Sequence, residues 1–125
     1  MTWTVRALTP EHAAVEIIYS GVVDRTELEA SYVVTFELAS ASDTWHVLCD
    51  LSDLTGGHSF FDLYALVTSV SNLGLGSRFR EALLVTEHPE LLERARFWET
   101  ASVNRGVAAR AFTDRDTALA WLSRP

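Results

Sequence analysis

The chain has 125 residues, of which 48% are hydrophobic and 22% are charged, and a formal net charge of −7. This length and composition predict one globular domain, residues 1–125, with its own core. The acidic balance argues against a nucleic-acid partner, and no apolar run is long enough to span a membrane. Cys49 is the single cysteine, so no internal disulfide forms, and without a secretory signal we expect a cytoplasmic protein.

The first third of the chain predicts two strands and a helix. Two short apolar runs are typical of strands: Val5–Leu8 and Ala14–Tyr19. Asp24 is followed three residues later by Glu27, which is the spacing of a capping box and favours a helix over Arg25–Ala39. The segment from Tyr32 to Leu38 also alternates with period two, as a strand would, and the capping box decides for the helix.

A polar loop, Ser40–Asp43, leads into a buried strand and a second helix. Trp45–Leu51 is the apolar run of the strand, and Ser52–His58 is expected to be a loop because it contains two adjacent glycines. Ser59 with Asp62 repeats the capping-box spacing, so a helix begins there. Its apolar face has helical spacing: Leu63, Leu66, Val67 and Val70.

Two strands and two helices complete the predicted fold. The apolar runs of the strands are Glu81–Thr86 and Val107–Phe112. Pro89 opens the helix between them, and Glu90 and Arg94 form a favourable i,i+4 charge pair on it. The last helix, Asp114–Leu122, follows a third capping-box spacing: Thr113 with Asp116.

Two strands followed by alternating helices and strands predict an α/β fold. Such alternation implies right-handed crossovers and a mostly parallel sheet covered by helices. We therefore expect a single domain with a mixed sheet of five strands, of which the first is an antiparallel edge, and about four helices.

Two stretches are similar to the STAS superfamily, the domain of anti-sigma-factor antagonists and sulfate transporters. The run Asp50–Leu54 (DLSDL), with Ser59 after a loop, resembles the strand-end D-L-x-x-L of the family and its downstream serine. The segment from Phe112 to Leu122 resembles the F-x-D-x-x-x-A-x-x-W-L close of the SpoIIAA-like branch, whose members also resemble the Sec14 lipid-binding fold. The predicted order of elements is that of the family. The resemblance implies a SpoIIAA-like fold and a regulatory or protein-interaction module.

The serine at the start of the second helix has two interpretations. In anti-sigma-factor antagonists the matching serine lies in a D-S-x-G setting, and its phosphorylation switches partner binding. Ser59 aligns with it, but His58 replaces the aspartate, and Phe60 and Phe61 replace small residues. Ser59 is therefore either a phospho-acceptor or a helix cap. The loop before the helix is also a candidate anion or ligand site: Gly56, Gly57, His58 and Ser59.

No residues form a catalytic or metal-binding pattern. The four histidines lie at no metal-ligand spacing: His12, His46, His58 and His88. Adjacent side chains such as those of His58 and Ser59 point apart, so they form no catalytic dyad. Asp50 and Asp53 lie at a strand end without a partner base, which indicates a role in ordering the loop. We expect no enzyme activity, no cofactor and no metal.

Three aromatic residues exceed what the inward faces of their helices can hold. Phe60 and Phe61 are consecutive, so both cannot face one core, and Phe97 lies beside Trp98, which shares the face of Leu91. Exposed aromatic rings mark contacts with a partner or an apolar ligand, and the alternative is that each ring is tucked under a loop. The leading hypothesis is a protein-interaction module that pairs as a homodimer. The alternative is a carrier of a small apolar or lipid ligand, as the Sec14-like relatives imply.

Overall fold

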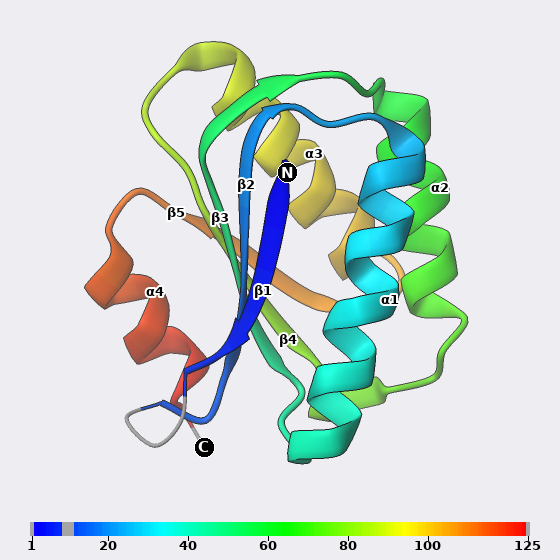
Figure 1. The fold of residues 1–125 in the computed structure, drawn as a ribbon, viewed down its shortest axis with the longest axis vertical. Coiled ribbons are helices and arrows are strands. Elements are labelled where there is room, and N and C mark those ends of the chain that lie inside the picture. Colours follow the sequence, from blue (N-terminus) through cyan, green and yellow to red (C-terminus); the bar gives the residue numbers. More distant parts are fainter. Residues whose placement is uncertain (1, 9–11, 125) are drawn as a thin grey trace.

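Five strands form one sheet in the order β1-β2-β3-β4-β5 in the computed structural model, which describes residues 2–8 and 12–124. The strands are β1 (Trp3–Ala7), β2 (Val15–Val22), β3 (His46–Gly56), β4 (Arg80–Leu84) and β5 (Ala108–Phe112). β1 is an antiparallel edge, and the other neighbours are parallel. This arrangement, drawn in Figure 1, confirms the predicted mixed sheet.

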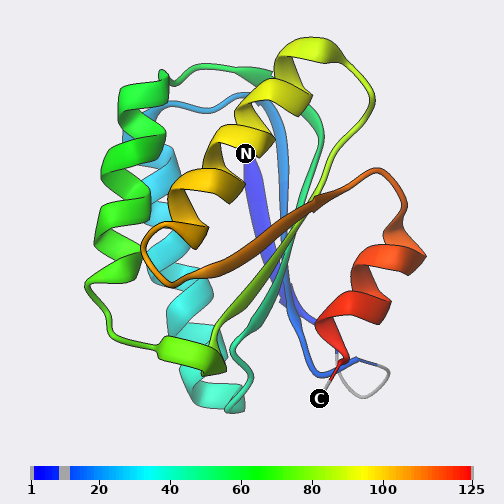
Figure 2. The same ribbon diagram turned by 180° about the vertical axis from the view of Figure 1, so that it is seen from behind.

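Three helices cover one face of the sheet. α1 (Arg25–Ser42), α2 (Phe60–Ser71) and α3 (Pro89–Val103) each connect neighbouring parallel strands. Right-handed crossovers in a sequential strand order put all three on the same side. α4 (Arg115–Leu122) follows the last strand and lies on the opposite face (Figures 1 and 2). In the described part of the chain, no helix is long and apolar enough to cross a membrane.

Side-chain caps set where α1, α2 and α4 begin. The carboxylate of Asp24 accepts a hydrogen bond from the backbone N–H of Glu27 at 2.9 Å, so α1 starts at the predicted capping box. The prediction that Thr113 caps the last helix is wrong by one residue. Asp114 is the cap, because its carboxylate accepts both the backbone N–H and the hydroxyl of Thr117.

The end of α1 differs from the predicted one. The segment from Tyr32 to Leu38 is helical, and the helix continues to Ser42, so most of the predicted loop Ser40–Asp43 is the last turn of α1. Asp43 ends the helix with a left-handed backbone (φ 49°), and its N–H bonds to the carbonyl oxygens of Ala39 and Ser40. Aspartate tolerates this conformation better than most residues, which explains why the helix stops here.

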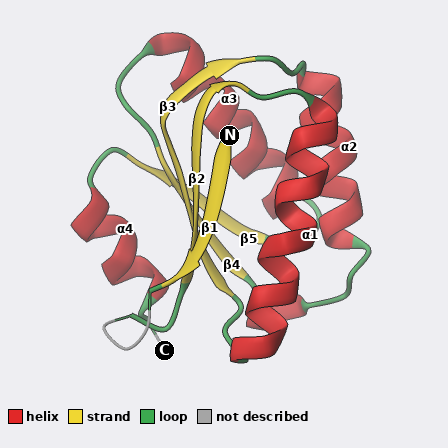
Figure 3. Cartoon of the chain, viewed as in Figure 1, coloured by secondary structure: helices red, strands yellow, loops and turns green. Residues whose placement is uncertain are grey.

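β3 is longer than the sequence predicts. Residues 52–56, expected to begin a loop, continue the strand because β2 runs on beside them. Ser20 pairs with Asp53 and Val22 pairs with Gly56 across this extension, with two irregularities in register. Gly56 therefore ends the strand, and Gly57 begins the short connection to the start of α2 (Figure 3).

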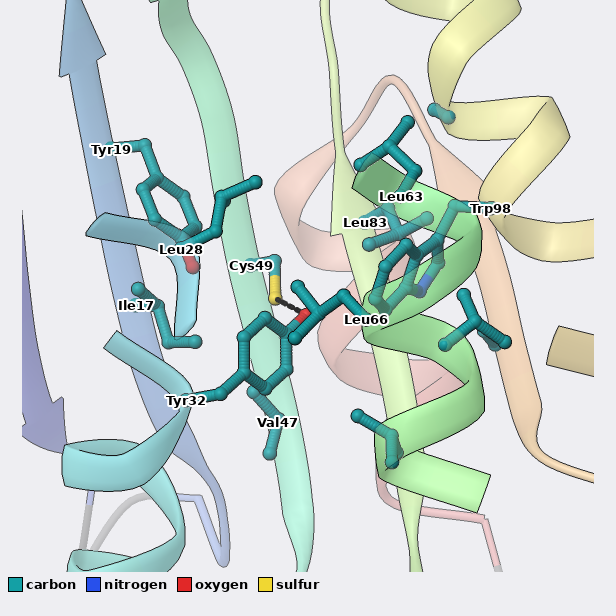
Figure 4. Packing of buried hydrophobic residues seen from close by; sticks show 14 of the residues in the cluster. Ile17, Tyr19, Leu28, Tyr32, Val47, Cys49, Leu63, Leu66, Leu83 and Trp98 are labelled. Atoms are coloured by element: carbon teal, nitrogen blue, oxygen red, sulfur yellow. Dashed lines mark hydrogen bonds between the residues drawn. The ribbon is translucent and has the colours of Figure 1, made fainter. Parts of the chain in front are cut away.

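The two faces of the sheet hold separate cores. Alternate residues of a strand point to opposite faces, so Val47 and Cys49 enter the main core under α1, α2 and α3, while Leu48 enters the core under α4. The main core also contains large side chains from every covering helix (Figure 4): Tyr32, Leu63, Leu66 and Trp98 are examples. The smaller core under α4 consists of Ala14, Leu48, Ala82, Leu84, Ala118, Leu119 and Leu122.

A buried carboxylate of β2 forms ion pairs with β1 and with α4. Glu16 of β2 is fully buried, and its two oxygens pair with Arg6 of β1 at 2.7 Å and with Arg115 of α4 at 2.6 Å. Burying a charge is costly, and ion pairs with good hydrogen-bond geometry offset this cost. The edge strand and the last helix are therefore both joined to the sheet through Glu16.

Candidate functional site

The main core contains a carboxylate that is held by three uncharged donors. Glu81 of β4 is fully buried. The hydroxyl of Tyr32 donates to its Oε2 at 2.5 Å, the thiol of Cys49 donates to the same oxygen at 3.1 Å, and the indole N–H of Trp98 donates to Oε1 at 2.5 Å. These donors come from α1, β3 and α3, so one side chain joins three elements to β4. Figure 4 shows Tyr32, Cys49 and Trp98 among the packed leucines.

The electrostatics of this cluster are dominated by burial. Among the described residues Glu81 makes no ion pair, because the acidic partners of the salt bridges are Glu16 and Glu29. Burial raises the pKa of Glu81, and the hydrogen bonds from Tyr32, Cys49 and Trp98 oppose that rise. Burial and then the charge of Glu81 also raise the pKa of the Cys49 thiol, which keeps the thiol protonated as a donor.

A small apolar cavity adjoins the cluster. Its volume is about 50 Å³, and seven of its 14 lining residues are leucines. Tyr32, Cys49 and Trp98, the three donors to Glu81, are among the lining residues. All lining side chains except that of His58 come from the sheet and from α1, α2 and α3, so the cavity lies between the sheet and those helices.

A wider polar groove lies at the carboxyl ends of β3 and β4. Its volume is about 470 Å³, and its lining runs from Ser52 to Gly56 on one side and from Thr86 to Arg94 on the other. The groove and the cavity share three lining residues: Leu54, Leu91 and Arg94. Ligands of α/β folds bind beyond the carboxyl ends of the strands, which is the position of this groove.

The predicted loop site is a tightly closed turn. Ser59 is the N-cap of α2: its hydroxyl accepts the N–H of Asp62 at 3.1 Å, and the carboxylate of Asp62 accepts the N–H of Ser59 at 2.9 Å. His58 is buried, and its Nδ1 donates to the carbonyl oxygen of Val23 at 2.9 Å. Gly57 has φ 105° and approaches Val23 so closely that a Cβ would lie 2.7 Å from its backbone.

This closure leaves little for an anion to bind. The carboxylate of Asp62 already occupies the helix terminus, and the N–H of Ser59 lowers the pKa of that carboxyl, which keeps it negative. Gly56 ends β3 instead of presenting a free N–H cradle. The geometry accounts for Ser59 as a cap, and its roles as a phospho-acceptor or an anion site stay predictions.

The three predicted surplus aromatics divide into two groups. Phe60 and Phe97 pack against each other with ring centroids 5.0 Å apart, and Phe97 is half-buried against the main core. Phe61 is 71% exposed. Sequence reasoning missed Tyr64, one turn further along α2, whose side chain is 47% exposed.

Sequence reasoning also missed Glu81 and Arg94. Glu81 stands two residues before Leu83 in β4, so period-two alternation assigns it to the buried face, and this was the available signal. Arg94 does not form the predicted pair with Glu90. Its guanidinium instead donates to the carbonyl oxygen of His58 and thereby bridges α3 to the start of α2.

Within residues 2–8 and 12–124, no group of three or more His, Cys, Asp or Glu side chains is placed to hold a metal ion.

Comparison with known proteins agrees with the architecture. No protein-family model and no curated protein matches the chain. A solved structure that it resembles is an uncharacterized protein of the DUF3478 family, with a SpoIIAA-like fold, from Shewanella loihica PV-4. The TM-score is 0.58 over 96% of this chain and 91% of the other, at 18% identity. The chain has a SpoIIAA-like fold. The fold that the sequence resemblance predicted is confirmed, and at this identity the likeness extends to the fold alone.

Replacing Glu81 by glutamine should change how stability depends on pH. Glutamine does not titrate, whereas burial raises the pKa of Glu81 above its ordinary value of 4.5. The folded carboxyl thus holds its proton more tightly than the unfolded one, so Glu81 costs stability as the pH rises from 4.5 through its folded pKa. Urea unfolding of both chains between about pH 4 and pH 8 measures this. The native chain should lose free energy of unfolding relative to Glu81→Gln as the pH rises, and a difference that does not vary with pH contradicts the role of burial.

Proposed function

We propose that the chain is a non-catalytic, cytoplasmic interaction module that pairs with a second copy of itself through an aromatic patch on α2. The aromatic patch consists of Phe60, Phe61 and Tyr64, which are 39%, 71% and 47% exposed. Tyr64 lies three residues after Phe61 and four after Phe60, so on the surface of α2 it is the neighbour of both rings. This exposure is the observation that carries the proposal, because large rings gathered on a monomer's surface favour association.

The surroundings of the aromatic patch suit a protein interface. The guanidinium of Arg105 lies 4.4 Å from the ring centroid of Tyr64, and that of Arg94 lies 5.4 Å from the ring centroid of Phe60. Aromatic and arginine side chains are the residues enriched at interface hot spots. α2 contains a single charged residue, Asp62, so the net charge of −7 opposes pairing least at this helix.

Two further features support a non-catalytic, self-pairing module. A two-fold axis lets one patch serve both subunits, which is why identical chains commonly pair this way. Glu81, at the centre of the most unusual polar cluster, is fully buried and lines neither the cavity nor the groove, and a catalytic group must touch its substrate. The resemblance to anti-sigma-factor antagonists, which act by binding proteins, points in the same direction.

Light scattering tests the pairing. We expect the native chain of 13.9 kDa to scatter as a dimer and the double variant Phe61→Ser/Tyr64→Ser to scatter as a monomer, because the variant removes the most exposed rings of the patch. Phe60 is left in place because it supports Phe97. Leu73→Ser is the matched control, since Leu73 is 53% exposed but lies outside the patch, and it should remain dimeric. A native monomer, or a dimer that survives the double change, rules the proposal out.

A second candidate function is the carriage of a small apolar ligand, and the leucine-lined cavity favours it. A dry cavity in a core binds small apolar molecules when they match its volume. Leu63 and Leu66 of α2 line the cavity while Phe61 and Tyr64 face outward, so both candidate functions use the same helix.

Native mass spectrometry after a mild purification tests the carrier function. A small molecule should accompany the native chain and should be lost from Ala95→Leu, because Ala95 lines the cavity and a larger side chain there occupies its space. Thr100→Leu, on the exposed face of α3, is the control and should keep the molecule. A native chain whose mass is that of the polypeptide alone counts against this function.

A further inference from the structure

Arg94 has a positive charge that no carboxylate in the described residues neutralises. It is half-buried in α3, donates one hydrogen bond to the carbonyl oxygen of His58, and lies over the ring of Phe60. The salt bridges of the described residues involve only Arg6, Arg25 and Arg115. A guanidinium has five N–H donors, so most of its binding capacity is left. Arg94 lines both the cavity and the groove, so this spare capacity lies where the two meet.

The other charged groups near this junction restrict what it can bind. Asp53 and Glu90 line the groove and are exposed, whereas no acidic residue of the described chain lines the cavity. A negative group is therefore attracted next to Arg94 and repelled further out, by Asp53 and Glu90. His88 also lines the groove, and His58 lines the cavity. This arrangement favours a ligand with one negative charge over a dianion such as a phosphate monoester.

The size of the cavity restricts the apolar part of the ligand. About 10–15 Å³ on the same measure holds one water molecule, so a cavity of about 50 Å³ has room for a few heavy atoms. A short alkyl tail fits this room, and a long acyl chain does not. The leucines supply apolar contacts, and the buried carboxylate of Glu81, bonded to the lining residues Tyr32 and Trp98, disfavours a second negative charge beside them.

We propose that the cavity and the groove together bind a short-chain aliphatic monocarboxylate, with its alkyl tail among the leucines and its carboxylate on Arg94. The proposal rests on the second candidate function, the carriage of a small apolar ligand, and names the class of that ligand. The planar guanidinium matches the two oxygens of a carboxylate with a pair of parallel hydrogen bonds. Such a ligand brings a charge that balances Arg94 and covers the apolar mouth formed by Leu54 and Leu91.

Titration calorimetry with three probes of one shape tests the proposal: isovalerate, isoamyl alcohol and isoamylamine. These probes share a branched alkyl tail and differ in the charge of the head. Isovalerate should bind at least about tenfold more tightly than the alcohol, because it adds charge-assisted hydrogen bonds to Arg94, and the amine should bind most weakly. This comparison uses the native chain and does not depend on any variant.

Two variants of α3 locate the charge. Arg94→Gln should weaken the binding of isovalerate about tenfold or more and leave the binding of the alcohol unchanged. Arg96→Gln removes the same charge from the same helix, but Arg96 is exposed and lines neither space, so it should leave isovalerate binding unchanged. If Arg94→Gln fails to fold, Arg94→Lys is the substitute, because lysine keeps the positive charge but lacks the planar guanidinium. This variant should bind isovalerate more weakly than the native chain and still bind it more tightly than the amine.

Several outcomes overturn the proposal, and they separate it from the function beneath it. If the alcohol binds as tightly as isovalerate, the proposal that the ligand is a carboxylate is refuted, whereas the carrier function is not. If Arg94→Gln and Arg96→Gln weaken the binding of isovalerate equally, the charge acts at long range, and the contact between the carboxylate and Arg94 is refuted. A chain that binds none of the three probes refutes both the ligand class and the carrier function.

Discussion

The three hydrogen bonds that converge on Glu81 connect α1, α3 and β3 to β4. Tyr32, Cys49 and Trp98 belong to α1, β3 and α3, and each donates to the same carboxylate of β4. Because a buried carboxylate without donors is strongly disfavoured, these elements can pack only where their donors reach it. The network thereby fixes how α1 and α3 lie on the sheet, and its three donors line the cavity, which shares Arg94 with the groove.

The two faces of the sheet solve the problem of a buried carboxylate in opposite ways. Glu16 is neutralised by Arg6 and Arg115, both of which reach it from partly exposed positions. Glu81 is surrounded by uncharged donors and receives no ion pair among the described residues, so burial raises its pKa. The ion pairs of Glu16 hold β1 and α4 through arginines that are partly exposed to solvent. The hydrogen bonds of Glu81 instead place a titratable group inside the main core.

Local signals in the sequence predicted most of the fold to within a few residues, and the larger misses depend on contacts between separate elements. The capping residues Asp24 and Ser59 set two helix starts correctly because a cap depends on neighbours three residues away. The extension of β3 to Gly56 depends on pairing with the strand β2. Arg94 bonds to the carbonyl oxygen of His58, in the connection before α2, instead of to Glu90 on its own helix. The burial of Glu81 was accessible from strand alternation, but its three donors are distant in sequence and no spacing rule connects them.

The titration of Glu81 itself tests this account most directly. Carbon-13 NMR of the glutamate carboxyls can follow Glu81 in the folded native chain and in Tyr32→Phe, which removes one donor and keeps the ring. We expect Glu81 to titrate above 4.5 in the native chain and higher still in Tyr32→Phe, because the lost hydrogen bond favoured the charged form. Titration of Glu81 at an ordinary pKa, or at the same pKa in both chains, would contradict the central place of this network.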